Sequence, residues 1–526
     1  MRPLIHACPC LRVEREPRPR QPPRAPNVET QPREQSTQPA MAKLVVPLIT
    51  ACLLFASVAA GVVTHAGEAL VMHRLASATG ADGALNWSAG SDPCAWLGVT
   101  CNDLGRVYNI SVNGVGLNGS LPSDLGGFSS LLTLDVRSNR LTGPLPRLWS
   151  VPLLSTLRLD NNSFTEVPRG FFSSVRALRH FSASNNTRLQ EWELPRYVLR
   201  RLTRLVSFEV DNAGVTGTVV DFLGDNGDGA FSLLERISMA NNDLSGPIPD
   251  KFASQRLQYL DLHQNHLSGP ITSLCNLVSL VELRVDGNEF TGPLPDFTSM
   301  KKLLVLFLAD NRLTGAVPAS LTGLEGLQSV TITGNFLQGP LPRFASIVRD
   351  DVDAAAANGS FCRLDYGPCD PRVDMLLSIA AGFNYPEVLA RSWRRNDPCH
   401  GWDGVYCGNG GEVKRLNLCR MGLNGTMTPA FGSLTSLVDI LISGNNVTGV
   451  IPSSVAKLPS LRLLDVSDNE LEGTMPVFRS DVEIWSDGNP KLNKTSVTSC
   501  SPPPSKAFSV AGVVAAAFLV FYFYGY

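Results

Sequence analysis

The stretch 257–342 reads LQYLDLHQNHLSGPI from residue 257, LVELRVDGNEFTGPLP from 280, LLVLFLADNRLTGAVP from 303 and LQSVTITGNFLQGPLP from 327. Its landmark glycines Gly269, Gly292, Gly315 and Gly339 are 23, 23 and 24 residues apart. A fixed period of this size is typical of a solenoid, in which every unit stacks on the next. No unit can bury its leucines alone, so the stack must share one continuous apolar column.

Each unit predicts a short strand followed by a turn. Leu260 and Leu262 alternate with polar or aromatic residues, which is the period of a strand with its leucines directed inward. Asn265 follows at the turn, where its amide can bond to backbone groups that the bend leaves without partners. We therefore expect a ladder of asparagines along the stack.

The two ends of the 526-residue chain differ from the repeats. Residues 1–40 are rich in arginine and proline, which predicts a disordered leader or a gene-model extension. Residues 41–66 resemble a secretory signal peptide, with a transit peptide followed by a membrane anchor as the alternative. Residues 507–526 carry no charge and are long enough to span a membrane. This tail is expected to belong to a truncated single-pass protein, or to be replaced by a lipid anchor.

Two segments share one order of residues and predict caps, because the first unit of a solenoid otherwise exposes its core. The N-terminal cap covers 67–106, contains WSAGSDPCAWLGVTC, and begins with an expected amphipathic helix. A non-repeat island, 343–411, ends in SWRRNDPCHGWDGVYC, a second cap with a helix expected at 372–381. The predicted repeat blocks are 107–342 with about ten units and 412–487 with three, before a linker at 488–506.

Cysteine pairs beside tryptophans in a secreted chain favour disulfides over a metal site. The predicted pairs are Cys94 with Cys101, Cys362 with Cys369, and Cys399 with Cys407. Cys275 is expected to be a buried free thiol, Cys419 to point outward from its strand, and Cys500 to lie in the linker.

Nine Asn-x-Ser/Thr sequons predict glycosylation and fit a secreted surface protein. They are Asn86, Asn109, Asn118, Asn161, Asn185, Asn358, Asn424, Asn446 and Asn493. Because no sequon falls between Asn185 and Asn358, the middle of the first block is predicted to be free of glycan.

Several chemistries are disfavoured by the sequence. Gly114, Gly116 and Gly119 match a phosphate-loop pattern, but they fall at a repeat turn without the helix that such a loop requires. His263 and His266 are expected to face different ways, so a metal site is not predicted. Residues 67–506 carry a net charge of about −6, which gives no footprint for nucleic acid. We predict no cofactor and no enzymatic activity.

The predicted partner-binding surface is the outward set of the concave strands near the middle of the first block, together with the adjoining island. The alternative is that glycans or the island cover Phe307. An aromatic residue in an outward strand position is costly to expose without a use, and aromatic and arginine side chains dominate interface energies. The outward sets also include Glu282, Val305 and Ala309. The residues proposed to contact a partner are Tyr259, Asp261, His263, Arg284, Asp286 and Phe307.

The skeleton L-x-x-L-x-L-x-x-N-x-L-x-G-x-[IL]-P resembles the plant extracellular leucine-rich repeat. More specifically, CDPRVDMLL from Cys369, NDPC from Asn396 and LRLLDVSDN from Leu461 resemble the extracellular domain of plant receptor-like kinases of the transmembrane-kinase (TMK) subfamily. This resemblance implies an α/β solenoid, a right-handed superhelix in two blocks, each with a disulfide-bonded N-terminal cap, separated by a non-repeat island.

The resemblance also implies a single-pass plasma-membrane receptor with its ectodomain outside the cell, acting in auxin-linked growth signalling. Its implied partners are a protein or peptide ligand, secreted auxin-binding cupin proteins, or co-receptor ectodomains. The kinase of full-length relatives is not represented, since VAIK, HRD and DFG motifs do not occur in the sequence. The alternatives are a cell-wall inhibitor of a microbial hydrolase and a decoy of full-length receptors.

Overall fold

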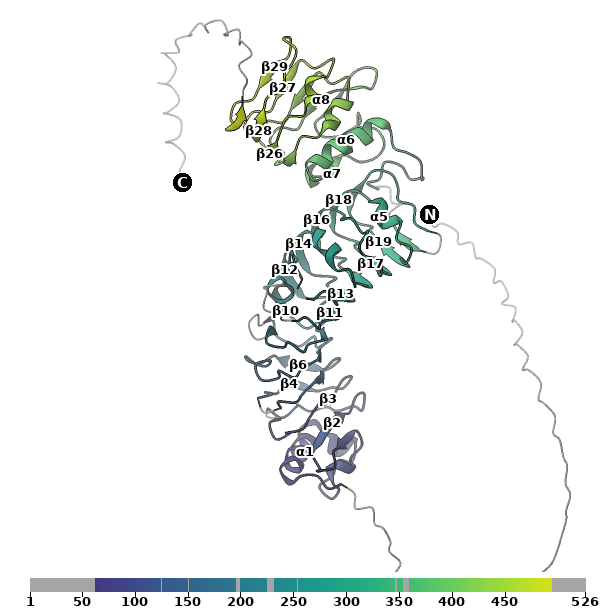
Figure 1. Cartoon of the computed structure of the whole chain (residues 1–526). Coiled ribbons are helices and arrows are strands. Elements are labelled where there is room, and N and C mark those ends of the chain that lie inside the picture. The colour runs from purple at the N-terminus through teal and green to yellow at the C-terminus, as the bar shows by residue number, and fades with distance from the viewer. Residues whose placement is uncertain are drawn as a thin grey trace, which may run out of the picture. The chain divides into compact units, whose positions relative to one another are not determined.

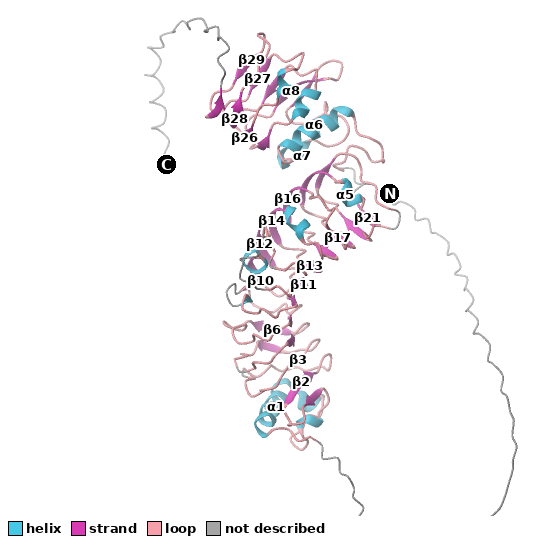
Figure 2. Cartoon of the chain, viewed as in Figure 1, coloured by secondary structure: helices cyan, strands magenta, loops and turns pink. Residues whose placement is uncertain are grey.

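The structure is a computed structural model that describes residues 62–493, apart from 124, 150, 195–198, 225–230, 253, 346–347 and 353–358. Within these residues the chain forms a stack of short strands joined by turns and small helices (Figures 1 and 2). The predicted leader, most of the predicted signal peptide, the predicted membrane segment, Asn358 and Cys500 lie outside the described residues. No helix of the described part is long and apolar enough to cross a membrane.

The first block is organised by one twelve-stranded sheet. Its first two strands are antiparallel, and each later strand pairs in parallel with the strand before it. We call the surface formed by the outward side chains of this sheet the strand face. The strands are β1 (Val99–Cys101), β2 (Val107–Ser111), β3 (Thr133–Asp135), β5 (Thr156–Arg158), β7 (His180–Ser182), β9 (Ser207–Glu209), β11 (Arg236–Ser238), β13 (Tyr259–Asp261), β15 (Glu282–Arg284), β17 (Val305–Phe307), β19 (Ser329–Thr331) and β21 (Arg349–Asp351).

The apolar column predicted from the repeat is present. Leu260, Leu283 and Leu306 are aligned across β13, β15 and β17, so equivalent leucines stack directly on one another. Four leucines singled out by the register are at most 1% exposed. They are Leu262, Leu283, Leu306 and Leu308. The predicted leucine-rich-repeat solenoid is therefore confirmed.

The asparagine ladder is also present. The Asn265 side chain donates to the carbonyls of Met239 and Leu262, each at 3.0 Å, and accepts from the Leu244 N–H at 3.0 Å. One amide thus satisfies backbone groups of its own repeat and of the preceding one. The same arrangement recurs at Asn139, Asn162, Asn186, Asn242, Asn288, Asn311, Asn335, Asn445, Asn469 and Asn489.

A second ladder of strands follows the turns and is broken near the start of the block. β4 (Thr142–Pro144) pairs only with β6 (Ser163–Glu166), and a separate sheet of seven strands starts at β8. The break coincides with a change in the distance along the chain from the ladder asparagine of a repeat to the proline that ends its turn. This distance is seven residues in most repeats, but six at 162–168 and nine at 186–195. A cavity of about 570 Å³ opens there. The seven strands are β8 (Trp192–Glu193), β10 (Val215–Thr218), β12 (Asp243–Gly246), β14 (His266–Pro270), β16 (Glu289–Pro293), β18 (Arg312–Ala316) and β20 (Phe336–Gln338).

The second block repeats the design on a smaller scale. Its main sheet contains β22 (Val405–Cys407), β23 (Val413–Asn417), β25 (Asp439–Leu441), β27 (Leu463–Asp465) and β29 (Glu483–Trp485). Its second ladder contains β24 (Asn424–Thr426), β26 (Asn446–Gly449), β28 (Glu470–Thr474) and β30 (Lys491–Asn493).

Helices are short except in the caps (Figure 2). The two longest are α1 (Ala66–Thr79) and α6 (Pro371–Gly382), the predicted cap helices. The remaining helical elements are α2 (Ala81–Ala84), η1 (Pro93–Ala95), α4 (Val220–Leu223), η2 (Thr272–Asn276), α5 (Ala319–Thr322), α7 (Glu387–Ser392), η3 (Pro429–Ser433) and α8 (Ser453–Ala456). The structure joins Cys94 to Cys101, Cys362 to Cys369 and Cys399 to Cys407.

Three predicted boundaries require correction. The island is not free of repeat structure, because β21 extends the long sheet in register with β19. The second block has a fourth parallel strand, β29, within its predicted bounds, where three repeats were expected, and β30, inside the predicted linker, pairs with β28. At the other end, the Thr64 N–H already donates to Asp92 at 2.9 Å, so the cap begins before residue 67. Hydrogen bonds of the backbone, rather than leucine spacing, define these edges.

Candidate functional site

The predicted outward residues come together on the strand face of β13, β15 and β17. The register places Tyr259, Glu282 and Val305 in one row across these strands, and Asp261, Arg284 and Phe307 in the next row. Parallel neighbours of this kind are about 4.8 Å apart, so side chains in one row can touch. The face is therefore a continuous surface of aromatic and charged groups.

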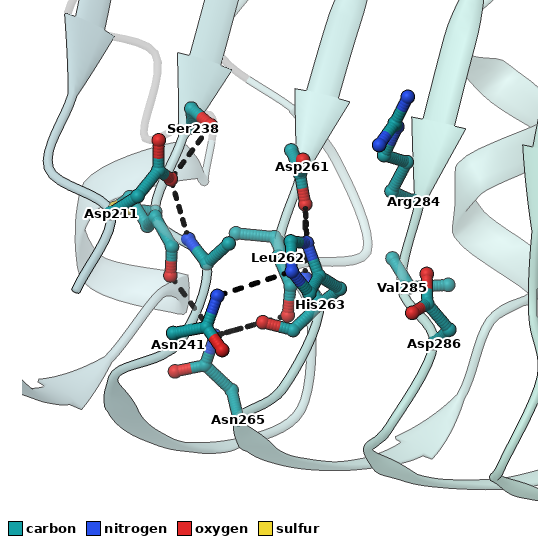
Figure 3. Close-up of polar contacts among 12 residues, drawn as sticks. Asp211, Ser238, Asn241, Asp261, Leu262, His263, Asn265, Arg284, Val285 and Asp286 are labelled. Carbon is teal, nitrogen blue, oxygen red and sulfur yellow. Dashed lines mark hydrogen bonds and ion pairs between the residues drawn. The ribbon is translucent and has the colours of Figure 1, made fainter. Parts of the chain in front are cut away.

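Asp261 organises the first of these strands. Its carboxylate accepts from the Tyr259 hydroxyl at 3.0 Å. It also lies 2.6 Å from His263 Nδ1, while Asn241 Nδ2 lies 3.1 Å from His263 Nε2 (Figure 3). The Asp261 residue is only 4% exposed. Asp261 thus lies on the predicted face, but its neighbours cover it, so its role is to position Tyr259 and His263 rather than to contact a partner.

Tyr259 is held from both sides. The Arg236 guanidinium lies 3.5 Å from the centre of the Tyr259 ring, and Arg236 Nε is 3.2 Å from a Glu209 carboxylate oxygen. Partial burial, followed by the negative charge of Asp261, raises the pKa of Tyr259 to about 12. Sequence reasoning missed Arg236, although it occupies the same outward position of β11 as Tyr259 does in β13.

Phe307 is covered on one side by Arg284. The guanidinium carbon lies 5.0 Å from the centre of the Phe307 ring, and Arg284 Nε is 2.5 Å from Glu282 Oε1. Both Arg284 and Phe307 remain half-buried. A guanidinium stacked on an aromatic ring is already oriented, so it loses little side-chain entropy when a partner binds.

Asp286 stands beside Arg284 on the same strand face (Figure 3). Its Oδ1 atom is buried and has no hydrogen-bond partner among the described residues. Burial raises the pKa of this carboxyl group, and the nearby charges of His263 and Arg284 only partly oppose the rise. An acceptor that is buried without a donor is costly, and a bound donor would relieve that cost.

A polar network continues the face toward the N-terminus. Asp211 accepts from the Ser238 hydroxyl at 2.7 Å and from the Ala240 N–H at 2.8 Å (Figure 3). Asp160 accepts from Ser182 and Ser184, and burial raises the pKa of its carboxyl group. These carboxylates are satisfied internally, unlike Asp286.

The other singled-out residues do not gather into a site. His266 pairs with Asp243 at 3.2 Å, away from His263, and no metal-binding group of three or more His, Cys, Asp or Glu occurs among the described residues. Gly114 and Gly116 adopt positive φ at a repeat turn. Cys275 was predicted to be a buried free thiol, but it is only partly buried. Its thiol lies at the surface of η2 and donates to the Thr272 carbonyl at 2.9 Å. Cys419 is a free, half-buried thiol.

The predicted glycosylation sites avoid the cluster around Phe307. Among the described sequons, all are exposed except Asn109, which is half-buried on β2. Asn161 and Asn185 lie side by side at the turns, where the Asn185 amide donates to Asn161 Oδ1 at 3.1 Å. Glycans on these two sites would lie two or more repeats away from β11 and β13.

Comparison with known proteins agrees with the repeats and the caps. Models of the leucine rich repeat match residues 256–277 and 411–471, and the model of the leucine rich repeat N-terminal domain matches 67–102 and 369–408. The N-terminal-domain model thus matches twice, once at each cap.

Two similar curated proteins are receptor-like kinases of Arabidopsis thaliana. TMK2 is 39% identical over 392 residues, covering 73% of this chain and 43% of the relative. TMK4 is 32% identical over 405 residues, covering 69% of this chain and 38% of the relative. The chain therefore spans about two fifths of the length of these relatives.

A solved structure shares the fold. It is the ectodomain of the Arabidopsis thaliana receptor kinase GASSHO1/SCHENGEN3 in complex with CASPARIAN STRIP INTEGRITY FACTOR 2. The identity is 24%, the TM-score is 0.50, and the match covers 81% of this chain and 47% of that one.

Proposed function

We infer that this chain, which belongs to the leucine-rich-repeat proteins and is homologous to the extracellular part of the TMK receptor-like kinases, is a receptor-like ectodomain that binds a protein, peptide or co-receptor. The proposed contact surface is the strand face of β11 to β17. It is centred on two stacked pairs, Arg236 with Tyr259 and Arg284 with Phe307.

The observation that carries this proposal is the Arg284–Phe307 pair. A half-exposed phenylalanine in an outward strand position contributes nothing to the leucine column behind it. Arginine and aromatic side chains are enriched among residues whose truncation costs an interface more than about 2 kcal/mol. Their pre-stacked geometry favours binding over folding as the reason for their presence.

The unpartnered oxygen of Asp286 supports the same surface. Oδ1 is buried and has no donor among the described residues, so a backbone N–H or a positively charged group of a partner can donate to it once the Asp286 side chain rotates outward. Such a bond to a charged acceptor is worth about 1.5–3 kcal/mol. The missing donor is therefore expected to come from the bound partner.

The finer setting follows from the resemblance to the TMK receptor-like kinases. We propose a role in auxin-linked growth signalling at the plasma membrane, with secreted auxin-binding cupin proteins or co-receptor ectodomains as partners. The role that we propose for residues 1–526 is binding without catalysis.

The test is capture of a secreted auxin-binding cupin protein, and separately of a co-receptor ectodomain, by the purified chain with and without auxin. Phe307→Ala with Arg284→Glu should weaken capture at least about tenfold, which is about 1.4 kcal/mol. The melting temperature should change little, because neither side chain belongs to the leucine column.

A matched control lies in the second block. Trp485→Ala with Arg415→Glu also removes one aromatic ring and reverses one arginine on a strand face, where Trp485 is 50% exposed and Arg415 pairs with Asp439. This control should leave capture unchanged. Capture at wild-type affinity by the first variant, or equal loss in both variants, would place the binding surface elsewhere.

A further inference from the structure

The positive charge of this chain is segregated in sequence. Residues 137–204 contain twelve arginines, no lysine and four acidic residues, whereas residues 67–506 as a whole are net negative. The whole-chain charge therefore conceals a local basic region. A count in a sliding window would have found it.

Four of these arginines surround one shallow basin before β5, β7 and β9. Arg176, Arg200, Arg201 and Arg204 line a depression of about 690 Å³ together with small and apolar residues such as Leu153. No aspartate or glutamate is among the lining residues that the structure describes. All the charged residues of this described lining are therefore positive.

The stacking of repeats places these arginines at one edge of the sheet. The Arg179 N–H donates to the Ser155 carbonyl, and the Val206 N–H donates to the Arg179 carbonyl, so the three segments leading into the strands are successive neighbours. Neighbouring strands are about 4.8 Å apart, so the basin crosses the stack of repeats as a short track. Such a track fits a linear ligand.

Three of the four arginines are not used by the fold. Among the described residues, Arg176, Arg201 and Arg204 make no hydrogen bond or ion pair through their side chains. Arg200 donates to the Gly224 carbonyl at 2.9 Å. Like charges held close together cost free energy, which an anionic ligand would recover.

The neighbouring His180 reports the same field. Burial and then the positive charges of Arg158 and Arg179 lower the pKa of His180. Two further arginines thus act near the basin, and the carboxylates of Glu209 and Glu235 partly oppose their effect on the pKa of His180.

We propose that this arginine basin binds a linear polyanionic polysaccharide that carries a carboxylate on each sugar, such as a uronic acid oligomer. Guanidinium groups match carboxylates with two parallel hydrogen bonds, and arginine surpasses lysine in this recognition. The basin lining has side-chain donors and a proline, Pro152, but no unpaired strand that could extend a peptide backbone. Repeated carboxylates on a stiff sugar chain therefore fit the track better than an acidic peptide does.

The experiment measures binding of a galacturonic acid decamer to the purified full chain by calorimetry at low and at moderate salt. Arg176→Glu, Arg201→Glu and Arg204→Glu together should weaken binding at least about tenfold and flatten its dependence on salt. The fully methyl-esterified decamer, which lacks the carboxylate charges, should not bind the unaltered chain.

The control reverses three exposed arginines elsewhere, Arg140→Glu, Arg188→Glu and Arg256→Glu, and so changes the net charge equally. It should retain binding within about twofold, and both triple variants should keep the wild-type circular dichroism spectrum. Equal loss in the two triple variants would overturn the basin as the site. Equal binding of poly-glutamate would overturn the polysaccharide in favour of an acidic peptide, and equal competition by inorganic phosphate would reduce the site to a small-anion site.

Discussion

The two caps have the same local structure in different surroundings. Trp87 and Trp96 stack at 5.0 Å in the first cap, and Trp393 and Trp402 stack at 5.2 Å in the second. Each pair lies next to a disulfide and an antiparallel pair of strands, whose register shifts at the second cysteine of the bridge. The same order of residues has therefore produced the same local fold twice.

The surroundings differ because only the second cap has repeats before it. Helix α1 leaves Leu70 63% exposed, so part of the predicted amphipathic helix faces solvent. In the second cap, the Trp393 carbonyl accepts from the Gln338 side chain at 2.7 Å, and the Arg391 guanidinium lies 5.3 Å from the Phe336 ring. The second cap therefore joins two blocks, whereas the first covers an end.

The caps also differ in one buried position. Glu68 is completely buried in α1 and accepts from Arg106 at 3.3 Å, from the Val107 N–H at 2.6 Å and from the Ser129 N–H at 3.2 Å. The corresponding position of α6 is Val373, which is 1% exposed. A terminal cap is thus tied to its first repeat by a charged network, and the internal cap by apolar contact.

The largest expected change in stability follows from exchanging the residues at this position between the two caps. Glu68→Val should destabilise the first cap by about 3–5 kcal/mol, because it leaves buried donors and Arg106 without their acceptor. Val373→Glu should also destabilise the second cap, since it buries a carboxylate in an apolar site. Urea unfolding measures both, and Glu325→Val, at an exposed glutamate, is the control expected to change stability by less than about 0.5 kcal/mol. A comparably small effect of Glu68→Val would show that the network is dispensable.

The next prediction compares the leucine columns of the two blocks. Leu306→Ala should cost about 2–5 kcal/mol as a core truncation, and Leu464→Ala, at the equivalent position of β27, should cost a similar amount. Both leucines are 0% exposed. Thermal unfolding of the purified chain measures the pair. A change within about 0.5 kcal/mol for either variant would contradict the proposed register for that block.

A smaller effect is expected from the cap disulfides. Replacing Cys94 and Cys101 by serine, or Cys399 and Cys407 by serine, should cost about 2–3 kcal/mol each, because the bridges close loops of similar length. Hydrogen exchange in the two caps measures the local loss. Non-reduced peptide mapping of the unaltered chain is the companion measurement, and a bridge from Cys101 to Cys399 would refute the model of two separate caps.

The smallest prediction concerns acid. Asp370 begins α6, and its carboxylate accepts from the Arg372 N–H at 2.8 Å and from the Arg372 guanidinium at 2.7 and 2.9 Å. The Arg372 side chain, opposed by partial burial, lowers the pKa of Asp370. Since the folded pKa lies below the unfolded value of about 3.9, the stabilisation is present above that pH and is lost as the pH falls through the folded pKa.

Because Asp370 is partly exposed, this loss should be less than about 1 kcal/mol. Helix α1 begins instead at His65, whose ring accepts from the Gly67 N–H. Hydrogen exchange between pH 5 and pH 2 should therefore show acid-sensitive protection at the start of α6 that disappears in Asp370→Asn. Identical acid profiles for α6 in the variant and in the unaltered chain would contradict this role of Asp370.

The repeats, the two caps and the cysteine pairs were predictable because each depends on residues close together in sequence. Leu306 is inward because of the alternation within its own strand, and Cys399 meets Cys407 across a loop of eight residues. The same reasoning failed for β21, whose Arg-Asp-Asp sequence has no leucine pattern. The existing edge of β19 supplies its hydrogen bonds, and local sequence does not contain that information.

The features that matter for binding depend on contacts between repeats more than twenty residues apart. Asp261 is an exception, because the residues that cover its carboxylate, Tyr259 and His263, lie two positions away in its own repeat. Arg236 stacks on Tyr259 from the strand before, and Arg176 joins Arg201 and Arg204 from the next repeat. Period and composition place each of these residues on a face. The pairing of these side chains is decided only when the parallel strands bring neighbouring repeats into contact. The reason is that ion pairs, hydrogen bonds and ring contacts act over a few ångströms.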